Sequence, residues 1–344
     1  MKVVFLSRQF FPDIGGVEKH VLEISKQLIA RGHDVTVISE GLESQNFSLF
    51  QKQTKIHVYK ISVGRDEKKK KFLIWKWFWK NRQLLQNADI IHCHDVFYWY
   101  LPFRFLYPHK PVFTTFHGYE NFPIKKKAIL IRKISEKLSR GNICIGDFIK
   151  KWYGTKSTFI SYGAVNVKTI DSRLRENDTK TKKDSAVFFG RLDEQTGILT
   201  YQKAITILRK KFPKFTLLII GNGKYKKLIS KKNNILPFRN NPEKYLPHYH
   251  FAFVSRYLSM LEAFAAKRLV FAVYDNPLKE DYLKMSPFAK FIIIVNTPED
   301  LAKRVAEILQ NPQQEKVMID TAYDWVKKQS WEEMTKLYLK LWKN

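Results

Sequence analysis

A glycine pair, Gly15 and Gly16, lies between a short apolar run and a helical pattern, where backbone groups can bind an anion. Without Cβ atoms these residues permit positive φ and a close approach of a ligand to the backbone. The free amides and positive dipole end of the following helix favour a phosphate by roughly 0.3–1 kcal/mol. Taken alone, the pair is more typical of a tight strand-to-helix turn, because short motifs often match by chance.

The segments on either side of this pair predict a strand, a helix and a second strand. Residues 3–6 and 35–38 are short apolar runs of the kind that form buried strands. Between them, apolar residues recur at four-three-four spacing and end before Gly32, the expected left-handed helix stop. The pair therefore lies where a strand turns into a helix. The apolar stripe of that helix is Val17, Val21, Ile24 and Leu28.

The rest of the chain alternates short apolar runs with helix-length segments. Strands that are apolar without strict alternation indicate parallel sheets covered on both faces, so the predicted class is α/β. Between residues 167 and 183 the pattern dissolves into polar residues, which predicts a linker between two domains. The other predicted strands are residues 90–93, 112–115, 143–145, 158–160, 187–189, 217–220, 251–254, 269–272 and 291–294.

The composition limits the size class of the protein and its partners. A chain of 344 residues suits about two domains, and a hydrophobic content of 44% can fill both cores. The 61 Lys and Arg against 32 Asp and Glu give a formal charge of +29. This charge favours nucleic acid, anionic lipid or phosphorylated small molecules. Cys93 and Cys144 lie in apolar runs without zinc or disulfide spacing, so we expect reduced core residues of a cytosolic protein.

The apolar runs are too short to span a membrane. The N-terminal run is interrupted at Arg8, which is not typical of a secretory signal. A membrane span needs roughly 18–20 uncharged apolar residues, and no segment approaches this length. The sequence predicts a cytoplasmic protein that is soluble or bound peripherally at the inner face of the cell membrane.

The residues around the glycine pair match a longer pattern. P-x-x-G-G-x-E-x-H begins at Pro12, and R-G-H-x-V-x-V begins at Arg31. Together they resemble the amino-terminal signature of family 4 glycosyltransferases, retaining sugar transferases with the GT-B fold. The resemblance implies two Rossmann-like, doubly wound parallel-sheet domains that face a central cleft. It implies an acceptor-side domain at residues 1–166, a nucleotide-sugar domain at 184–329, and a terminal helix, 330–344, that crosses back to the first domain.

A second motif, G-R-L-x-x-x-T-G from Gly190, resembles the family's G-R-L-x-x-x-K-G, whose arginine and lysine hold the donor diphosphate. Arg191 would clamp two phosphate oxygens and offset charge on the departing diphosphate; a surface arginine is the alternative. Thr196 stands at the lysine position and removes one charge, so either a nearby lysine substitutes or catalysis is weak. Gly221, in the G-x-G after the predicted strand 217–220, would lie near the nucleotide.

A third segment, residues 253–267, resembles the family motif in which two glutamates eight residues apart flank a helix start. Glu262 matches the second glutamate, which accepts hydrogen bonds from the ribose hydroxyls. The first glutamate has no counterpart, because Val254 stands there. The amides of Leu258 and Ser259, at the helix start, are candidates to bind phosphate. A solvated carboxylate is the alternative for Glu262, although its apolar neighbours predict burial with a partner.

Phe116-His117-Gly118 resembles the family's F-H-G, whose histidine lies beside the donor sugar. His117 would hydrogen-bond and position the sugar, while the departing phosphate takes the acceptor proton. A core histidine with satisfied hydrogen bonds is the alternative. His92 and His94 share a strand face, but no third ligand and no D-x-D triplet are evident, so no metal site is predicted.

The acceptor side contains a basic, aromatic segment at residues 68–80. Anionic headgroups attract each lysine by about 1 kcal/mol, and buried indoles would add to this attraction. Residues 97–105 and 125–127 add further aromatic and basic side chains to the same half. This pattern predicts docking on an anionic membrane and a lipid-linked acceptor. A helix that packs its aromatics on the sheet and solvates its lysines explains the pattern equally well.

Together these features predict a metal-independent, retaining glycosyltransferase that moves a sugar from a nucleoside-diphosphate donor to an acceptor hydroxyl. The expected role is cell-surface glycan or glycolipid synthesis, with a glycan or lipid-linked acceptor and no cofactor beyond the nucleotide-sugar substrate. A nucleotide-binding paralogue with impaired catalysis is a second hypothesis, supported by Thr196 and Val254. A nucleic-acid binder is a third, although no recognisable RNA or DNA module is found in the sequence.

Overall fold

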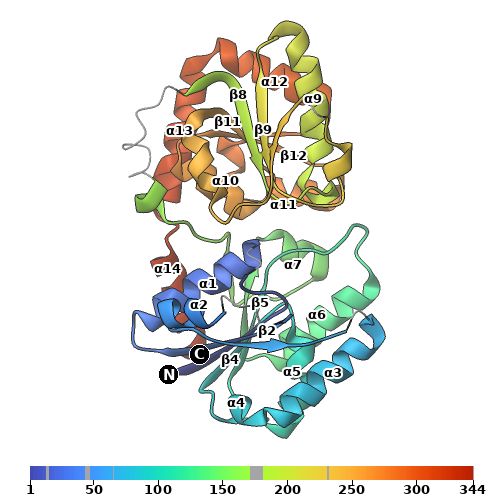
Figure 1. The fold of residues 1–344 in the computed structure, drawn as a ribbon, viewed down its shortest axis with the longest axis vertical. Coiled ribbons are helices and arrows are strands. Elements are labelled where there is room, and N and C mark those ends of the chain that lie inside the picture. The colour runs from blue at the N-terminus through green and yellow to red at the C-terminus, as the bar shows by residue number, and fades with distance from the viewer. Residues whose placement is uncertain (13–14, 43–46, 65, 171–180, 231, 344) are drawn as a thin grey trace. The chain divides into compact units, whose positions relative to one another are not determined.

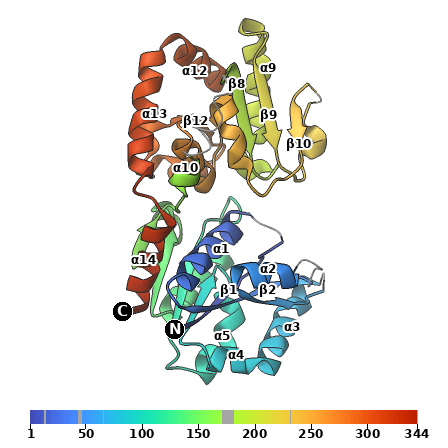
Figure 2. The ribbon, with the colours of Figure 1, turned by 60° about the vertical axis from the view of Figure 1, so that its left-hand side comes forward.

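The computed structural model describes residues 1–344 except 13–14, 43–46, 65, 171–180, 231 and 344. The chain divides into two compact units (Figures 1 and 2). Unit 1 consists of Met1–Ser161 and Trp331–Asn344, and unit 2 consists of Tyr162–Ser330. Each unit contains one parallel sheet with helices packed on it, which confirms the predicted α/β class. Most of the predicted linker, residues 171–180, lies outside the described residues.

The sheet of unit 1 has seven parallel strands in the order β3-β2-β1-β4-β5-β6-β7. The strand order reverses between β1 and β4, so the loops after these two strands flank the switch point of a doubly wound sheet. Ligands of such sheets bind at the carboxyl ends of the strands beside this point. The strands are β1 (Lys2–Ser7), β2 (Asp34–Glu40), β3 (His57–Ile61), β4 (Ile90–His94), β5 (Val112–Phe116), β6 (Gly141–Ile145) and β7 (Phe159–Ser161).

The helices of unit 1 come from both ends of the chain. The last helix, α14, packs against α1, β6 and β7 (Figure 2). The packing is close, because a Cβ on Gly141 of β6 would lie 2.8 Å from Leu341 Cδ1 of α14. The helices are α1 (Gly16–Ile29), α2 (Phe47–Thr54), α3 (Glu67–Lys80), α4 (Arg82–Gln86), α5 (Phe97–Leu106), α6 (Lys126–Leu138), α7 (Phe148–Tyr153) and α14 (Trp331–Lys343).

The core of unit 1 is rich in aromatic residues. Phe78 of α3 packs with Trp99 and Phe103 of α5 over the apolar strands. Burial of each such ring contributes roughly 1.5–3 kcal/mol, which is why α3 and α5 are held firmly on the sheet. Cys93 and Cys144 are free and buried in β4 and β6. Burial raises the pKa of the Cys144 thiol to about 12 and also raises that of Cys93, so both thiols are inert core groups, as predicted.

The sheet of unit 2 repeats the same topology with six parallel strands, in the order β10-β9-β8-β11-β12-β13. Its switch point lies between β8 and β11. The loops that follow these two strands contain the second and third motifs found in the sequence. The strands are β8 (Lys182–Phe189), β9 (Thr216–Ile220), β10 (Asn234–Leu236), β11 (Tyr249–Phe253), β12 (Leu269–Val273) and β13 (Ile293–Val295).

The helices of unit 2 alternate with these strands, and short 3₁₀ turns fill several connections. Asn276, Thr297 and Asn311 cap α11, α12 and α13 with side-chain oxygens, and a proline follows each cap. Such caps fix helix starts by satisfying exposed amides. The α-helices are α9 (Ile198–Lys211), α10 (Tyr257–Ala265), α11 (Pro277–Lys284), α12 (Pro298–Gln310) and α13 (Pro312–Val326). The 3₁₀ helices are η1 (Glu194–Thr196), η2 (Lys226–Leu228), η3 (Pro242–His248) and η4 (Ala289–Phe291).

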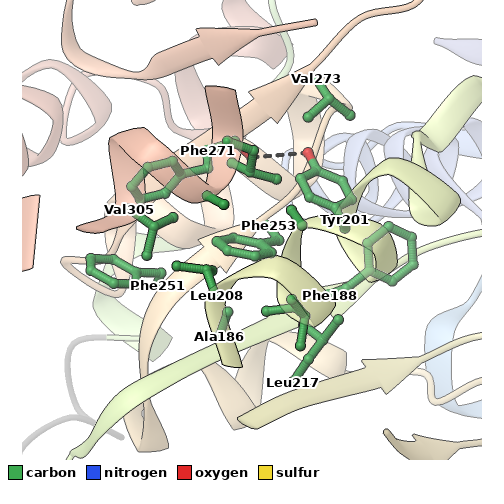
Figure 3. Packing of buried hydrophobic residues seen from close by; sticks show 14 of the residues in the cluster. Ala186, Phe188, Tyr201, Leu208, Leu217, Phe251, Phe253, Phe271, Val273 and Val305 are labelled. Carbon is green, nitrogen blue, oxygen red and sulfur yellow. Dashed lines mark hydrogen bonds between the residues drawn. The ribbon is translucent and has the colours of Figure 1, made fainter. Parts of the chain in front are cut away.

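Figure 3 shows the core between the sheet of unit 2 and helices α9 and α12. Tyr201 of α9 lies in this core, where its hydroxyl donates to the carbonyl of Phe271 at 2.9 Å. The hydroxyl has a single proton, so Ser255 must donate in the 2.6 Å bond that joins these two side chains. The Ser255 oxygen in turn accepts from the amide of Val273 at 3.0 Å. This buried network fixes the loop between β11 and α10.

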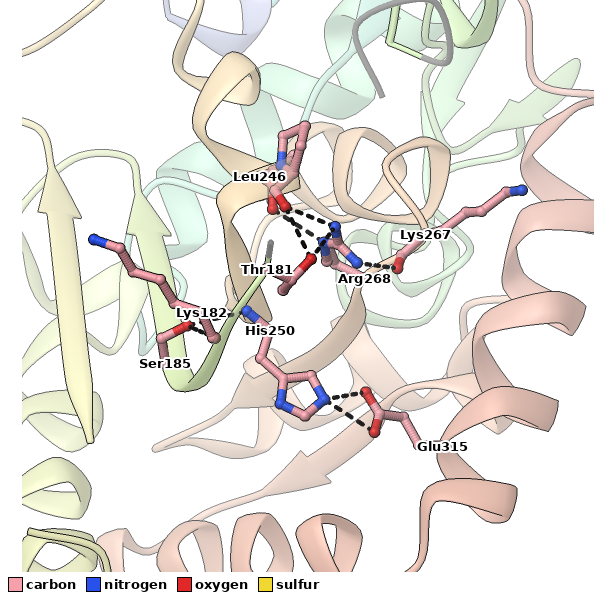
Figure 4. Close-up of polar contacts among 9 residues, drawn as sticks. Thr181, Lys182, Ser185, Leu246, His250, Lys267, Arg268 and Glu315 are labelled. Carbon is pink, nitrogen blue, oxygen red and sulfur yellow. Dashed lines mark hydrogen bonds and ion pairs between the residues drawn. The ribbon is translucent and has the colours of Figure 1, made fainter. Parts of the chain in front are cut away.

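Figure 4 shows polar contacts that hold the opposite, amino-terminal edge of the same sheet. Arg268 donates to the carbonyl oxygens of Leu246 and Pro247 at 3.0 and 2.8 Å, which ties the start of β12 to η3. His250 Nε2 lies 2.8 and 3.1 Å from the two carboxylate oxygens of Glu315, which ties β11 to α13. These contacts stabilise the frame, and they lie far along the strands from the switch-point loops.

The structure corrects several details of the sequence prediction. The strands β3 and β10 were not predicted, because both are short and carry polar residues. Phe291 lies in η4, so the last strand begins at Ile293 and not at Phe291. Strand β8 begins at Lys182, within the segment assigned to the linker.

Candidate functional site

Arg191 lies in the loop after β8, at the carboxyl end of the sheet of unit 2. Its side chain is 65% exposed, with Nε 3.2 Å from Asp193 Oδ2 and Nη2 donating to Gln195 Oε1 at 2.9 Å. Thr196 is buried, and its hydroxyl contacts the carbonyl oxygens of Arg191 and Asp193 at 2.8 and 2.9 Å. Thr196 therefore closes the loop and adds no charge, while the guanidinium stays accessible to a phosphate.

Two glycines allow the Arg191 loop to pack directly on the end of β9. A Cβ at Gly221 would lie 2.0 Å from the carbonyl oxygen of Gly190, and one at Gly223 would lie 2.5 Å from that of Leu192. The amide of Gly190 also donates to the carbonyl of Ile220 at 3.1 Å. The sequence predicts Gly221 near a nucleotide. The close approach that the structure shows for Gly221 is to the backbone that positions Arg191.

Helix α10 begins at the carboxyl end of β11 without a side-chain cap. The amide of its first residue, Tyr257, donates to the Tyr282 hydroxyl at 2.8 Å, and the amide of Met260 bonds within the helix. In the described part of the chain the amides of Leu258 and Ser259 have no acceptor, and both residues are only half-buried. An uncapped helix start with two such amides suits an anion.

Glu262 lies one turn further along α10, on a helix that is otherwise apolar. Its side chain is 3% exposed, so it is not a solvated surface carboxylate. A buried carboxylate requires polar partners, and the hydroxyls of a ribose could provide some of them. The Val254 that replaces the family's first glutamate is buried directly after the end of β11.

A lysine that the sequence motifs did not indicate lies beside this helix start. Lys279 is in the first turn of α11, and its ammonium donates to the carbonyl of Ser255. Its nitrogen is 4.3 Å from the centre of the Tyr282 ring, and the side chain is 1% exposed. Burial, and secondarily the Arg256 guanidinium, lower the pKa of Lys279 well below its usual range, while Asp193 acts in the opposite direction.

The glycine pair of unit 1 begins α1 at the carboxyl end of β1. Gly15 is the N-cap with φ −95°, and Gly16 is not in the positive-φ region either, so the turn does not use the positive φ that its glycines permit. A Cβ at Gly16 would meet nothing within 4 Å, whereas one at Gly15 would lie 2.6 Å from Glu18 Oε2. The turn therefore has open space at Gly16, but Glu18 already provides a negative charge at the positive helix end. A neutral ligand fits such a turn better than a second anion.

Beside this turn, a directed chain of hydrogen bonds crosses unit 1. The indole of Trp342 can only donate, and it donates to His92 Nδ1 at 3.0 Å. His92 is neutral, because burial lowers its pKa well below 6.5, so its Nε2 carries the proton and donates to Thr115 at 2.7 Å. Thr115 must then donate to Tyr338 at 2.8 Å, and Tyr338 to His20 Nε2 at 2.9 Å. Each side chain in this series of hydrogen bonds therefore has a hydrogen-bond partner.

His117 belongs to a second histidine pair at the end of β5. Its Nε2 lies 2.8 Å from Nδ1 of the buried His94, and its backbone amide donates to the Asp95 carboxylate at 3.1 and 3.2 Å. His94 Nε2 is buried without a hydrogen-bond partner. An unpaired buried acceptor costs less than an unpaired N–H, so His94 donates from Nδ1 and His117 accepts at Nε2. Burial lowers the pKa of His117 well below 6.5, so its proton is on Nδ1, where it can donate to a ligand.

Among the described residues, no group of three or more His, Cys, Asp or Glu side chains is arranged to hold a metal ion. His92 and His94 both point into the packed interior, where each bonds to protein groups. None of the described helices is both long enough and apolar enough to cross a membrane.

The two halves of the chain match two established families. Residues 14–156 match Glycosyltransferase Family 4, and residues 170–325 match Glycosyl transferases group 1. The fold is that of GT-B proteins: a glycosyltransferase from Rickettsia africae superposes with a TM-score of 0.71 at 16% identity, over 99% of this chain and 97% of that one. Anabaena HepE, solved with UDP and glucose, gives a TM-score of 0.73 at 12% identity, over 99% and 98% of the two chains.

A curated relative is the phosphatidyl-myo-inositol mannosyltransferase of Mycobacterium tuberculosis, which is 25% identical over 241 residues. The match covers 65% of this chain and 61% of that protein, so it spans less than two thirds of the relative's length. The fold and these matches define a two-unit α/β protein of the GT-B class. The chain belongs to glycosyltransferase family 4, as its sequence motifs predicted.

The structure places most of the predicted site residues after strands at the carboxyl edge of the sheet in each unit. In unit 2, Arg191, Leu258 and Ser259 follow the two strands that flank the switch point. In unit 1, the Gly15-Gly16 turn follows β1, and His117 follows β5 and bonds to His94 at the end of β4. Sequence reasoning missed Lys279 because no motif marks it. Its only signal is its position in the first turn of a helix, just after the buried strand β12.

Proposed function

We propose that the protein is a retaining glycosyltransferase that transfers a sugar from a nucleoside-diphosphate donor to an acceptor hydroxyl. One observation carries this proposal: an exposed arginine and an uncapped helix start follow the two strands that flank the switch point of unit 2. Arg191 binds the diphosphate, and the amides of Leu258 and Ser259 bind its phosphate oxygens. Glu262 accepts hydrogen bonds from the ribose hydroxyls.

The transfer needs stabilisation of a departing diphosphate more than it needs a protein base. The bond between the anomeric carbon and the diphosphate oxygen breaks, and the acceptor oxygen bonds to that carbon on the same face. The departing phosphate takes the acceptor proton, which keeps atoms and charge in balance. Arg191 and the helix amides offset the charge that develops on the leaving group. His117 donates a hydrogen bond from Nδ1 to a sugar oxygen, and the Gly15-Gly16 turn lies on the acceptor side.

The donor half of this proposal is tested by comparing transfer and hydrolysis across a panel of UDP-, GDP- and ADP-sugars. Arg191→Ala removes a charged contact to the leaving group, so we expect activity to fall by about 100-fold or more. Its thermal unfolding should not change, because the side chain is exposed. Arg304→Ala, which removes an exposed arginine of α12, is the matched control. Nucleotide binding without turnover across the panel would favour the impaired paralogue, and equal activity of Arg191→Ala would overturn the proposed role.

The acceptor half rests on three neighbouring helices of unit 1. Helix α5 packs against both α3 and α6, so the three helices are neighbours in unit 1 (Figure 1). Each presents large apolar side chains to solvent beside lysine or arginine residues, a combination that suits the interface of an anionic membrane. The relative named for a phosphatidyl-myo-inositol substrate is consistent with a lipid-linked acceptor. The exposed apolar residues are Phe72, Leu73 and Trp79 of α3, Phe105 and Leu106 of α5, and Leu130, Ile131 and Ile134 of α6.

Flotation with phosphatidylglycerol vesicles tests this surface. We expect binding at low salt, weaker binding at high salt because the lysine contribution is screened, and little binding to neutral vesicles. Phe72→Ser combined with Trp79→Ser should weaken binding, while Val317→Ser, an exposed apolar residue of α13, should not. No binding of the unaltered protein at low salt would end the membrane hypothesis. Binding to RNA of equal strength would instead favour a general polyanion surface.

A further inference from the structure

Lys279 is unusual among the buried charged groups of this protein. Two lysines are buried in the described part of the chain, Lys70 and Lys279. Lys70 lies 2.6 Å from the Glu40 carboxylate, which compensates its charge. In the same described residues, no carboxylate is close enough to Lys279 for an ion pair, and its hydrogen-bond acceptor is the Ser255 carbonyl. An ammonium buried with so little compensation is costly, so it requires an explanation other than stability.

The position of Lys279 relates it to the diphosphate site. Ser255, its acceptor, is two residues before the first residue of α10, whose Leu258 and Ser259 amides are open to an anion. The Tyr282 ring, on which the ammonium lies, bonds through its hydroxyl to the first amide of that helix. Lys279 is therefore next to the helix start that faces the ligand.

The same lysine is also coupled to the Arg191 loop. The charge of Asp193, which pairs with Arg191 at 3.2 Å, acts on Lys279. The other charges that act on Lys279 are Arg256, at the start of α10, and Asp275, in the loop after β12. These groups come from three different strand ends, so the lysine lies within the ring of charges at the carboxyl edge of the sheet.

The diphosphate site needs a second positive charge because the residue at position 196 has none. Thr196 uses its hydroxyl to close the Arg191 loop and carries no charge. Arg191 is a single full charge and the helix amides are neutral, so together they offset only part of the negative charge of a diphosphate, which grows on the leaving group as the sugar departs. We infer that Lys279 supplies the second positive charge of the diphosphate site, in place of the side chain at position 196. This inference rests on the proposed function, because it deepens the description of the same donor site.

Binding experiments separate the diphosphate from the rest of the nucleotide. Uridine, UDP, guanosine, GDP, adenosine and ADP are titrated calorimetrically into the wild-type protein and into Lys279→Met. We expect Lys279→Met to bind the preferred nucleoside diphosphate about 10- to 100-fold more weakly and the matching nucleoside equally well. Lys284→Met, which removes an exposed lysine of the same helix, is the matched control and should change neither affinity. Equal diphosphate affinity of Lys279→Met and wild type would overturn the inference.

A pH series distinguishes a supplied charge from a structural role. Lys279→Arg keeps its charge at every pH, and Lys279→Met never has one. The diphosphate affinity of the wild type should therefore approach that of Lys279→Arg at low pH and that of Lys279→Met at high pH. Parallel curves for the wild type and Lys279→Met would contradict the inference.

Stability gives an independent readout. Because methionine replaces a buried ammonium without a counter-ion, Lys279→Met should unfold at the same temperature as the ligand-free wild type or higher. A lower unfolding temperature together with unchanged diphosphate affinity would show a structural lysine. If the wild type binds none of the three nucleoside diphosphates, the proposed function itself fails, and that outcome is distinct from a failure confined to Lys279.

Discussion

The two sheets have the same strand order, yet the loops at their carboxyl ends carry different chemistry. At this edge of unit 1 the polar groups include His94 and His117, which burial keeps neutral, and Asp95, which lies 3.8 Å from Arg132. At the corresponding edge of unit 2 they include the basic residues Arg191, Arg256 and Lys279, with Asp193 paired to Arg191. The shared topology determines where a ligand binds, and the loop residues determine which chemical group is bound there.

The two edges suit two kinds of chemical group, neutral hydroxyls and oxyanions. A neutral imidazole donates one hydrogen bond and accepts another, which matches the hydroxyl groups of a sugar. It carries no charge that would attract a phosphate. Arginine and lysine bind oxyanions and stabilise charge on a leaving group. Conditions or substitutions that change one edge should therefore leave the other unaffected.

The largest difference between the edges should be the response to acid. Burial lowers the pKa of His20 from 6.5 to about 3, and lowers those of His92 and His94 well below 6.5. The unfolded chain binds protons that the folded chain does not bind, so stability is present above pH 6.5 and is lost as the pH falls toward the folded values. Each histidine should contribute a loss of about 1.4 kcal/mol per pH unit. Burial raises the pKa of Asp95 to about 6, so the folded chain binds a proton there before the unfolded chain does. This gain in stability on acidification offsets the loss from at most one of the three histidines.

Chemical denaturation at pH 7, 6 and 5, followed by tryptophan fluorescence, measures this loss selectively. Seven of the eight tryptophans belong to unit 1, and only Trp325 belongs to unit 2. His20→Gln should reduce the slope by one histidine. Equal stability at pH 7 and pH 5 would show that these histidines are not neutral in the folded state.

The second largest effect should come from the glycine turns. Gly221→Ala places a methyl group 2.0 Å from a backbone oxygen that cannot move without displacing the Arg191 loop. We expect a loss of about 3 kcal/mol in unfolding free energy and of diphosphate affinity together. Gly16→Ala is the counterpart in unit 1, where the methyl group meets nothing within 4 Å. It should be neutral or stabilise α1 by up to about 1 kcal/mol, because alanine favours a helix.

Calorimetric unfolding and nucleotide titration of the two alanine variants check this contrast. Lower transfer activity of Gly16→Ala, at unchanged stability, would show that the acceptor approaches the backbone there. Wild-type stability of Gly221→Ala would mean that the Gly190 carbonyl does not lie where the structure places it.

The contrast also shows what the sequence could reveal. Buried parallel strands have long apolar runs, so most of both sheets was predictable, whereas β3 and β10 are short edge strands without that pattern. Arg191 could be proposed from the sequence because its motif is local. Gly221 could be proposed as well, but its contact with Gly190 depends on how two loops pack, which no local motif describes.

The least predictable parts are networks whose members are far apart in the sequence. His20, His92, Thr115 and Tyr338 come from four elements, and only folding brings them into one chain of hydrogen bonds. Lys279 acts near Ser255, which is 24 residues away and on another helix–strand junction. Spacing rules detect residues on one turn or one strand, so they cannot predict such contacts.

A smaller effect should follow from Thr196→Val, which keeps the size of the side chain and removes its hydroxyl. The carbonyl oxygens of Arg191 and Asp193 lose their shared donor, and we expect a cost of about 1–2 kcal/mol in unfolding free energy. The looser loop should also weaken diphosphate binding several-fold. Thr206→Val on the exposed face of α9 is the control. Unchanged binding would show that the loop does not depend on this hydroxyl.

The smallest effects, about 1 kcal/mol each, should come from removing one tyrosine hydroxyl at each edge. Tyr201→Phe frees the Ser255 hydroxyl and the Phe271 carbonyl in unit 2, and Tyr338→Phe frees Thr115 and His20 in unit 1. The two variants remove the same atom from comparable buried networks, so their stabilities should fall by similar amounts.

Their functional consequences should nevertheless differ, and this makes the pair informative. The Ser255 side chain is held by Tyr201, and the Ser255 carbonyl accepts the hydrogen bond from Lys279. Tyr201→Phe should therefore weaken diphosphate binding. The contacts described for the Tyr338 side chain are with groups of unit 1. Tyr338→Phe should therefore leave diphosphate affinity unchanged while altering the acid dependence that His20 confers on unit 1. Isothermal titration with the preferred nucleoside diphosphate, alongside denaturation at pH 7 and pH 5, measures both properties. Equal losses of diphosphate affinity in the two variants would contradict the independence of the two edges. A neutral hydrogen-bond chain in unit 1 would then affect diphosphate binding at unit 2.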